Sequence, residues 1–160
     1  MNFTETIGVI GSIASIISII GAIFSWQKAN QAKQYSEIYY TTDTKEKLQT
    51  VFIRLESIQE VSYKLNSSDK RGLNESNEIK EYEAIRQKLN NLINITPSKY
   101  SVILTRLNSI KDNIDSLIQK STIMDTQDLI SFKTSINLCI GDVKSELENL
   151  RKDLVDLQNK

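Results

Sequence analysis

Histidine is missing from this chain of 160 residues, and cysteine and proline occur once each. Without an imidazole, the chain cannot build a histidine zinc site, a Ser-His or Cys-His nucleophile pair, or a histidine pH switch. A single cysteine also excludes an intramolecular disulfide and a cluster of thiolate metal ligands. Glycine-rich phosphate loops, EF-hand loops and GxSxG elbows are lacking too. We therefore expect a protein that is not an enzyme and that uses no cofactor or metal.

Net charge is lacking as well, because twenty Lys and Arg balance twenty Asp and Glu. A protein held on nucleic acid normally carries a broad cationic face, so we expect no nucleic-acid partner. There is no acidic excess of the kind that keeps a chain disordered. The length is close to that of one domain with one sizeable core. The sequence therefore predicts one folded domain and, besides it, only terminal segments.

The longest uncharged stretch runs from residue 7 to residue 26 and reads IGVIGSIASIISIIGAIFSW, with eight Ile among its twenty residues. A helix of that length is about 30 Å long, which matches the hydrocarbon core of a bilayer. We predict that residues 1–27 form a transmembrane anchor. Trp26, Lys28 and Lys33 follow where a membrane interface is expected.

Three other interpretations of this stretch are a cleaved signal peptide, a buried helix of a soluble fold and an interfacial helix. An interfacial helix needs a charged face, which this stretch lacks. A cleaved signal peptide begins with a basic segment, but the first six residues carry Glu5 and no Lys or Arg. A buried helix of a small soluble fold is rarely apolar on every face. The two lysines after the stretch favour a single-pass protein of the cell membrane, with its N-terminus outside and its C-terminal part in the cytoplasm.

Small residues in the predicted span are spaced three and four apart, so they line one face of a helix. Bulky Ile residues and Phe24 fall on a different face. Small residues let membrane helices approach closely, so we expect a homo-oligomer that associates within the bilayer through this face. The predicted self-association residues are Gly8, Gly11, Ser15, Ser18, Ala22 and Ser25.

Beyond the anchor, the three-and-four spacing of apolar residues predicts helices and no sheet. The juxtamembrane segment 28–43 has two interpretations. Asp43 and Glu46 can form a capping box if a new helix begins there. Alternatively, the membrane helix continues without a break and forms one rod of about sixty residues. The sequence does not decide between them.

Four amphipathic segments are predicted in the cytoplasmic part, residues 44–160, beginning with 44–66 and 74–94. Thr96 and Pro97 are expected to supply the N-cap and first position of the third helix, and the fourth covers 126–158. Short polar connections join the segments. We therefore expect an all-α fold, in which the transmembrane helix is followed by an antiparallel helical bundle with coiled-coil-like packing.

The fourth predicted helix is longer than its neighbours, and its last turns keep a heptad of apolar residues. That seam needs a partner, which is either the long first helix or another subunit. A break in the heptad is expected near Cys139 and Gly141. Cys139 itself is interpreted as a small buried hydrophobic residue. The predicted bundle or partner seam is Val143, Leu147, Leu150, Leu154 and Leu157.

Two function classes follow from this plan. In the first, the protein perturbs the membrane or opens a pore when its spans cluster, under control of the bundle or of a helical or regulatory partner. Small single-pass effectors of bacterial toxin and anti-phage systems have this general plan, although no diagnostic motif carries the likeness. In the second class, the span is only an anchor for an adaptor or for a structural subunit of a larger membrane complex.

Overall fold

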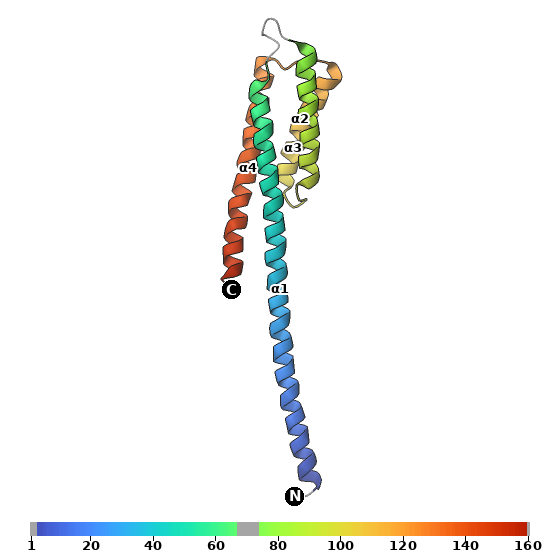
Figure 1. Ribbon diagram of the computed structural model, residues 1–160, viewed down its shortest axis with the longest axis vertical. Helices are drawn as coiled ribbons and strands as arrows, with labels where there is room; N and C mark the ends of the chain where they lie inside the picture. The colour runs from blue at the N-terminus through green and yellow to red at the C-terminus, as the bar shows by residue number, and fades with distance from the viewer. Residues whose placement is uncertain (1–2, 67–73, 160) are drawn as a thin grey trace.

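The computed structural model describes the backbone of residues 3–66 and 74–159 and the side chains of residues 18–66 and 74–159. Within those ranges the chain forms four α-helices and no strand (Figure 1). They are α1 (Phe3–Lys64), α2 (Glu75–Ile95), α3 (Ser101–Lys120) and α4 (Thr126–Gln158). The predicted all-α fold is confirmed.

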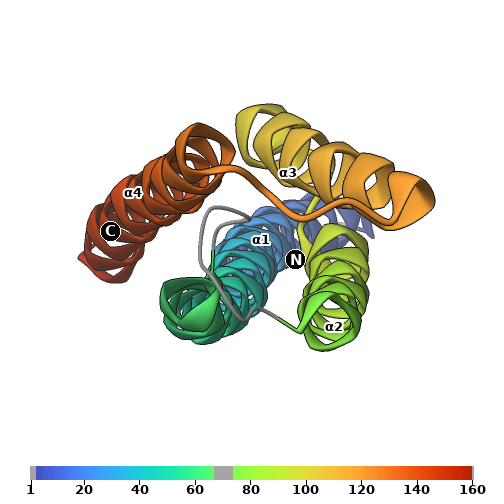
Figure 2. The same cartoon turned by 90° about the horizontal axis from the view of Figure 1, so that it is seen from above.

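The helices form an antiparallel bundle. Each contacts the two that lie next to it, in the cyclic order α1, α2, α3, α4 (Figure 2). The α1–α4 interface is the longest, because α4 continues along α1 after α2 and α3 have ended (Figure 1). The helical bundle predicted from the spacing of apolar residues is therefore present.

The core is built from those apolar positions. At three- and four-residue spacing, successive apolar residues return to the same side of a helix, and the bundle buries that side. All four helices contribute branched aliphatic side chains, and α2 and α4 add one aromatic ring each. The central residues are Leu48, Val51, Leu55 and Ile58 of α1, Tyr82, Ile85, Leu89 and Leu92 of α2, Ile103, Leu107, Ile110 and Ile114 of α3, and Phe132, Ile136, Cys139 and Val143 of α4.

The start of α4 is fixed by local hydrogen bonds. Asp125 occupies the N-cap, and its carboxylate accepts a bond from the backbone N–H of Asp128 at 2.7 Å. The connection before it is held from a distance, because the backbone N–H of Met124 donates to the hydroxyl of Tyr82 at 3.1 Å. α4 therefore begins at the residue that the sequence predicts.

The prediction that Thr96 caps the third helix is wrong. Thr96 closes α2 instead, since its backbone N–H and its hydroxyl both donate to the carbonyl of Leu92. Pro97 has no N–H and disfavours a helical residue before it, so α2 ends here. A turn in which the N–H of Tyr100 donates to the carbonyl of Pro97 follows, and α3 begins at Ser101.

α1 is one uninterrupted helix of 62 residues, about 93 Å long. The single-rod alternative is therefore the correct one, and Asp43 does not cap a new helix. Its carboxylate instead pairs with Lys47 one turn later, at 2.7 Å. The predicted segment 28–43 and residues 44–64 of the next one form parts of the same helix, which ends at Lys64.

No helix in the described part of the chain is both long enough and apolar enough to cross a membrane. The predicted span includes residues 7–17, whose side chains lie outside the described part. The transmembrane helix stays a prediction.

Candidate interaction surface

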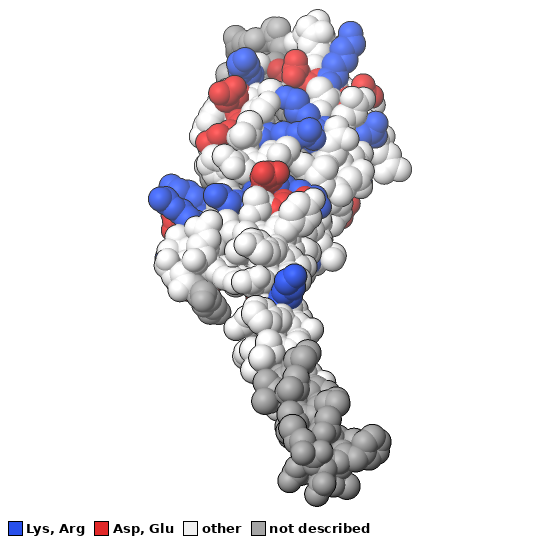
Figure 3. Space-filling model, turned by 60° about the horizontal axis from the view of Figure 1, so that its bottom comes forward, with Lys and Arg blue, Asp and Glu red and all other residues white. Residues whose placement is uncertain are grey.

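Every residue of α1 from Ser18 to Lys33 is exposed. In Figure 1 this part extends well beyond the end of α4. On the face drawn in Figure 3, the described part of this stretch is mostly uncharged, and its only charged residues are Lys28 and Lys33. Large apolar side chains are exposed on it, including Ile19, Ile23 and Phe24. We call residues 18–33 the projecting segment.

The sequence-predicted self-association residues divide between described and undescribed parts. Ser18, Ala22 and Ser25 lie on the projecting segment and are exposed. A methyl group added at Gly21 would meet nothing within 4 Å, so this stretch of backbone is open to close approach. No helix of the described bundle buries the face that carries Ser18, Ala22 and Ser25. The remaining predicted members, Gly8, Gly11 and Ser15, lie outside the described side chains.

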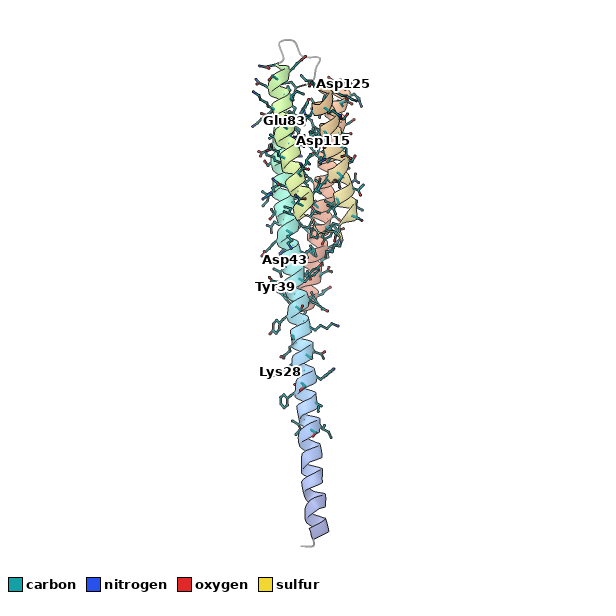
Figure 4. The ribbon with its side chains drawn as sticks, turned by 90° about the vertical axis from the view of Figure 1, so that its right-hand side faces the viewer. Lys28, Tyr39, Asp43, Glu83, Asp115 and Asp125 are labelled. Carbon is teal, nitrogen blue, oxygen red and sulfur yellow. The ribbon has the colours of Figure 1, made fainter. Side chains whose placement is uncertain are left out.

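The predicted membrane-interface residues are exposed on the same segment. Trp26 is 67% exposed, and Lys28 and Lys33 are also exposed. Figure 4 places Lys28 on α1 below the end of the other helices. Their arrangement therefore permits contact with a surface outside the protein.

The upper boundary of the projecting segment is set by α4. The side-chain amide of Gln34 donates a hydrogen bond to the backbone carbonyl of Leu157 at 2.8 Å. This carbonyl is in the last turn of α4, where helix carbonyls lack partners within the helix. The bond ties the end of α4 to α1 at Gln34, immediately after the projecting segment.

The end of α4, which carries the predicted seam, lies beside α1. The seam's role as a partner surface stays a prediction. Polar residues of α1 lie beside these last turns, where Gln34 binds the carbonyl of Leu157. Glu37 and Thr41 line a hollow with Asp153 and Asp156 of α4. Val143 and Leu150 are buried, whereas Leu147, Leu154 and Leu157 are half-buried.

A lysine between two aromatic rings joins the α2–α3 turn to α1. The ammonium of Lys99 lies 5.3 Å from the ring centroid of Tyr40 and 5.0 Å from that of Tyr100. Such cation–π contacts favour a fixed position of the turn. Burial raises the pKa of Tyr100, and Lys99 opposes part of that rise. Sequence reasoning missed this contact, because no local pattern relates Lys99 to Tyr40.

Cys139 is fully buried, as predicted. Burial raises the pKa of its thiol to about 12, with a smaller contribution from the charge of Asp142. Asp142 in turn pairs with Arg106 of α3. At neutral pH the thiol is protonated and enclosed, so it lacks the thiolate character that a nucleophile needs.

The described residues contain no group of His, Cys, Asp and Glu that could hold a metal ion. Carboxylates within the bundle serve in ion pairs, such as Asp115 with Lys111 at 2.6 Å. The projecting segment is therefore the candidate functional surface of the described chain.

No family model, curated protein or solved structure matches this chain. The function is inferred from its residues and their arrangement alone.

Proposed function

We propose that this protein is a non-enzymatic, single-pass membrane protein that self-associates through its transmembrane helix. In this proposal it perturbs the membrane or forms a pore, as an effector of the kind found in bacterial toxin and anti-phage systems. The helical bundle controls that activity. The observation that carries the proposal is the projecting segment, where large apolar residues are exposed and no charged residue occurs before Lys28.

Water is an unfavourable solvent for this segment. Burying one side chain such as Ile19, Ile23 or Phe24 is worth about 1.5–3 kcal/mol. An isolated helix in water is also marginally stable, because helices in proteins depend on the packing of an apolar face. The uncharged stretch 7–26 continues the segment toward the N-terminus to the length that a bilayer requires. Lipid would satisfy both needs.

The proposed topology follows from the charges beside the stretch. Lys28 and Lys33 lie on the side of the bundle, while Glu5 is the only charged side chain before the stretch. Cytoplasmic flanks carry the excess of Lys and Arg, so the bundle is proposed to lie in the cytoplasm and the N-terminus outside.

The unbroken α1 supports control by the bundle. It belongs to the bundle above Gln34 and to the proposed span below it. A change in bundle packing, caused by a helical or regulatory protein partner, would therefore move the span directly. Small residues at positions such as Ser18 and Ala22 would bring neighbouring spans close together.

The decisive experiment measures membrane potential in cells that express the full chain. We expect expression to depolarise them. Ser15→Leu combined with Ser18→Leu should abolish depolarisation, because two large side chains on the small-residue face keep the spans apart. The matched control, Ile13→Leu combined with Ile20→Leu, introduces two leucines on the bulky face and should preserve it. Circular dichroism checks that the bundle stays folded; unchanged depolarisation in the serine variant contradicts the proposal.

A second candidate is a membrane-tethered adaptor or subunit of a larger complex. The half-buried Leu154 and Leu157 and the exposed Val155 favour it, since they leave apolar surface on α4 for another protein. Replacing residues 7–26 by an unrelated span should then leave the function intact. Loss of function after that replacement supports the self-associating effector instead.

A further inference from the structure

One side of α1 carries aromatic residues through the projecting segment and beyond it. Phe24, Lys28, Tyr35 and Tyr39 are separated by four, seven and four residues, which returns them to the same side of an α-helix. The three rings are 60%, 72% and 77% exposed, and Lys28 is exposed too. We call these four residues the aromatic side of α1. Figure 4 labels two of them, Lys28 and Tyr39, on the part of α1 below α2 and α3.

The other sides of α1 at this level are occupied or acidic. Tyr40, next to Tyr39 but rotated by about 100°, contacts Lys99 of the α2–α3 turn. Gln34 holds the end of α4. Glu37 points to the hollow that it shares with Asp153 and Asp156, on the side of α1 opposite Tyr35 and Tyr39. The aromatic side is thus the one that no bundle helix covers.

Between Phe24 and Tyr39, the only charge on this side belongs to Lys28, because Lys33 and Glu37 fall on the opposite side of the helix. A tyrosine ring combines an apolar body with a polar hydroxyl, which suits the headgroup layer of a membrane. Lysines beside such rings are attracted to anionic lipids. The chemistry of the aromatic side therefore fits an anionic lipid surface.

Distance along the helix adds a geometric condition. Tyr35 and Tyr39 lie nine and thirteen residues beyond Trp26, or about 14 and 20 Å along the axis. The headgroup layer on one side of a bilayer is only about 5–8 Å thick. A helix perpendicular to the membrane cannot place Trp26 and both tyrosines in that layer. A strongly tilted helix brings the tyrosine rings closer to the layer. Tilt angles of membrane helices range from about 0 to 40°.

Resting on the proposed membrane span, we propose that α1 leans toward its aromatic side, so that Tyr35 and Tyr39 contact anionic lipid headgroups together with Lys28. The bundle helices lie on other sides of α1 and do not stand in the way. The tilt also turns the carboxylates of Glu37, Asp153 and Asp156 away from the anionic surface, which removes a repulsion that an upright helix would keep.

Trp26 is the single tryptophan, so tryptophan emission can test each position in turn. Three variants of the full chain combine Trp26→Phe with Tyr39→Trp, Tyr40→Trp or Tyr63→Trp. Each is placed in vesicles of phosphatidylglycerol and phosphatidylcholine with a spin label on the headgroup. We expect about twofold quenching at position 39 and almost none at position 63, at the far end of α1. Position 40 is the matched control, because it has nearly the same height on a different side.

Each outcome supports or overturns the proposal. Stronger quenching at position 39 than at position 40 supports a leaning helix. Equal quenching at both positions overturns it, since the side of the helix then makes no difference. No quenching at position 39, with native Trp26 quenched, overturns the tilt and keeps the span. If native Trp26 is not quenched either, the proposed membrane function fails as well. If the tryptophan at position 39 is shielded from water in the absence of lipid, a protein partner covers it, and the proposal is overturned.

Discussion

The upper and lower parts of α1 belong to one helix but stand in opposite surroundings. Above Thr44, every third or fourth residue is fully buried against neighbouring helices, as Leu48 and Leu55 are. Below Gln34, all described residues from Ser18 to Lys33 are exposed. The backbone is helical in both parts, so the two parts differ in what surrounds the helix and not in secondary structure.

The difference lies in the outer faces. Upper α1 places charged residues such as Arg54, Glu56 and Glu60 on its exposed side. Water therefore solvates that side, while the apolar side packs against the bundle. Projecting α1 has no charged face between Ser18 and Trp26, because that stretch contains only apolar residues, glycine and serine. Three-and-four spacing alone therefore does not predict what covers a helix; the charges between the apolar residues do.

The largest expected effect is in the upper part. Leu55→Ala removes a fully buried side chain and leaves a cavity, so we expect the free energy of unfolding to fall by about 2–5 kcal/mol. Ile53→Ala, two residues away and 59% exposed, should change it by no more than about 0.5 kcal/mol. Urea unfolding of the full chain in detergent, followed by circular dichroism, measures both. Similar losses in the two variants would mean that the two faces of upper α1 do not differ.

A charge in the projecting segment should act on membrane insertion instead of folding. Ile20→Lys places an ammonium inside the proposed span, at a cost of up to about 2.5–3.5 kcal/mol for insertion. We expect a smaller share of the protein in the membrane fraction after cell lysis and carbonate extraction. Ile53→Lys puts the same charge on the exposed side of upper α1 and should leave that share unchanged. Equal membrane shares for Ile20→Lys and the unaltered chain would argue against lipid around the lower part.

The N-cap of α4 stabilises the start of that helix within the bundle. Asp125→Ala removes the acceptor for the N–H of Asp128 and should lower the free energy of unfolding by about 1 kcal/mol. Asp125→Asn keeps an oxygen at the same place and should retain most of the stability. Urea unfolding compares the three proteins. A full loss in the Asn variant would show that the charge matters more than the hydrogen bond.

The boundary between the two regions gives the smallest effect. Gln34→Ala removes the hydrogen bond to the carbonyl of Leu157, and the site is partly exposed, so we expect a loss of about 0.5 kcal/mol. The change should be local, with faster hydrogen exchange in the last turns of α4 and unaltered exchange in α2. Gln49→Ala, at an exposed position of α1, serves as the control. Equal exchange in both variants would mean that Gln34 does not hold the end of α4.

The helices were predictable because their apolar positions repeat without conflict. α4 begins and ends at the predicted residues, and the buried role of Cys139 follows from its place beside the seam. The continuity of α1 was left open, since Asp43 and Glu46 are equally compatible with a cap and with a helix interior. Thr96 was misassigned because a threonine before a proline can close one helix as well as open the next.

The candidate surface was predictable only as a set of residue types. Uncharged residues before Trp26 indicate an apolar environment, but the length of helix left uncovered depends on where α4 ends, at Gln158. The Lys99–Tyr40 contact joins residues that are far apart in the chain, as does the bond between Met124 and Tyr82. Such contacts depend on how the helices pack, and neighbouring sequence carries no signal for them.

The enclosed thiol of Cys139 has a practical consequence for studying this chain. Maleimide and iodoacetamide dyes attack thiolates, and this sulfur offers none while the bundle is folded. A cysteine introduced on the exterior would accordingly take up a fluorophore or a nitroxide selectively, with the native sequence otherwise intact. Should the bundle open during its working cycle, uptake of dye by Cys139 would report the event directly, and the native chain would serve as its own sensor.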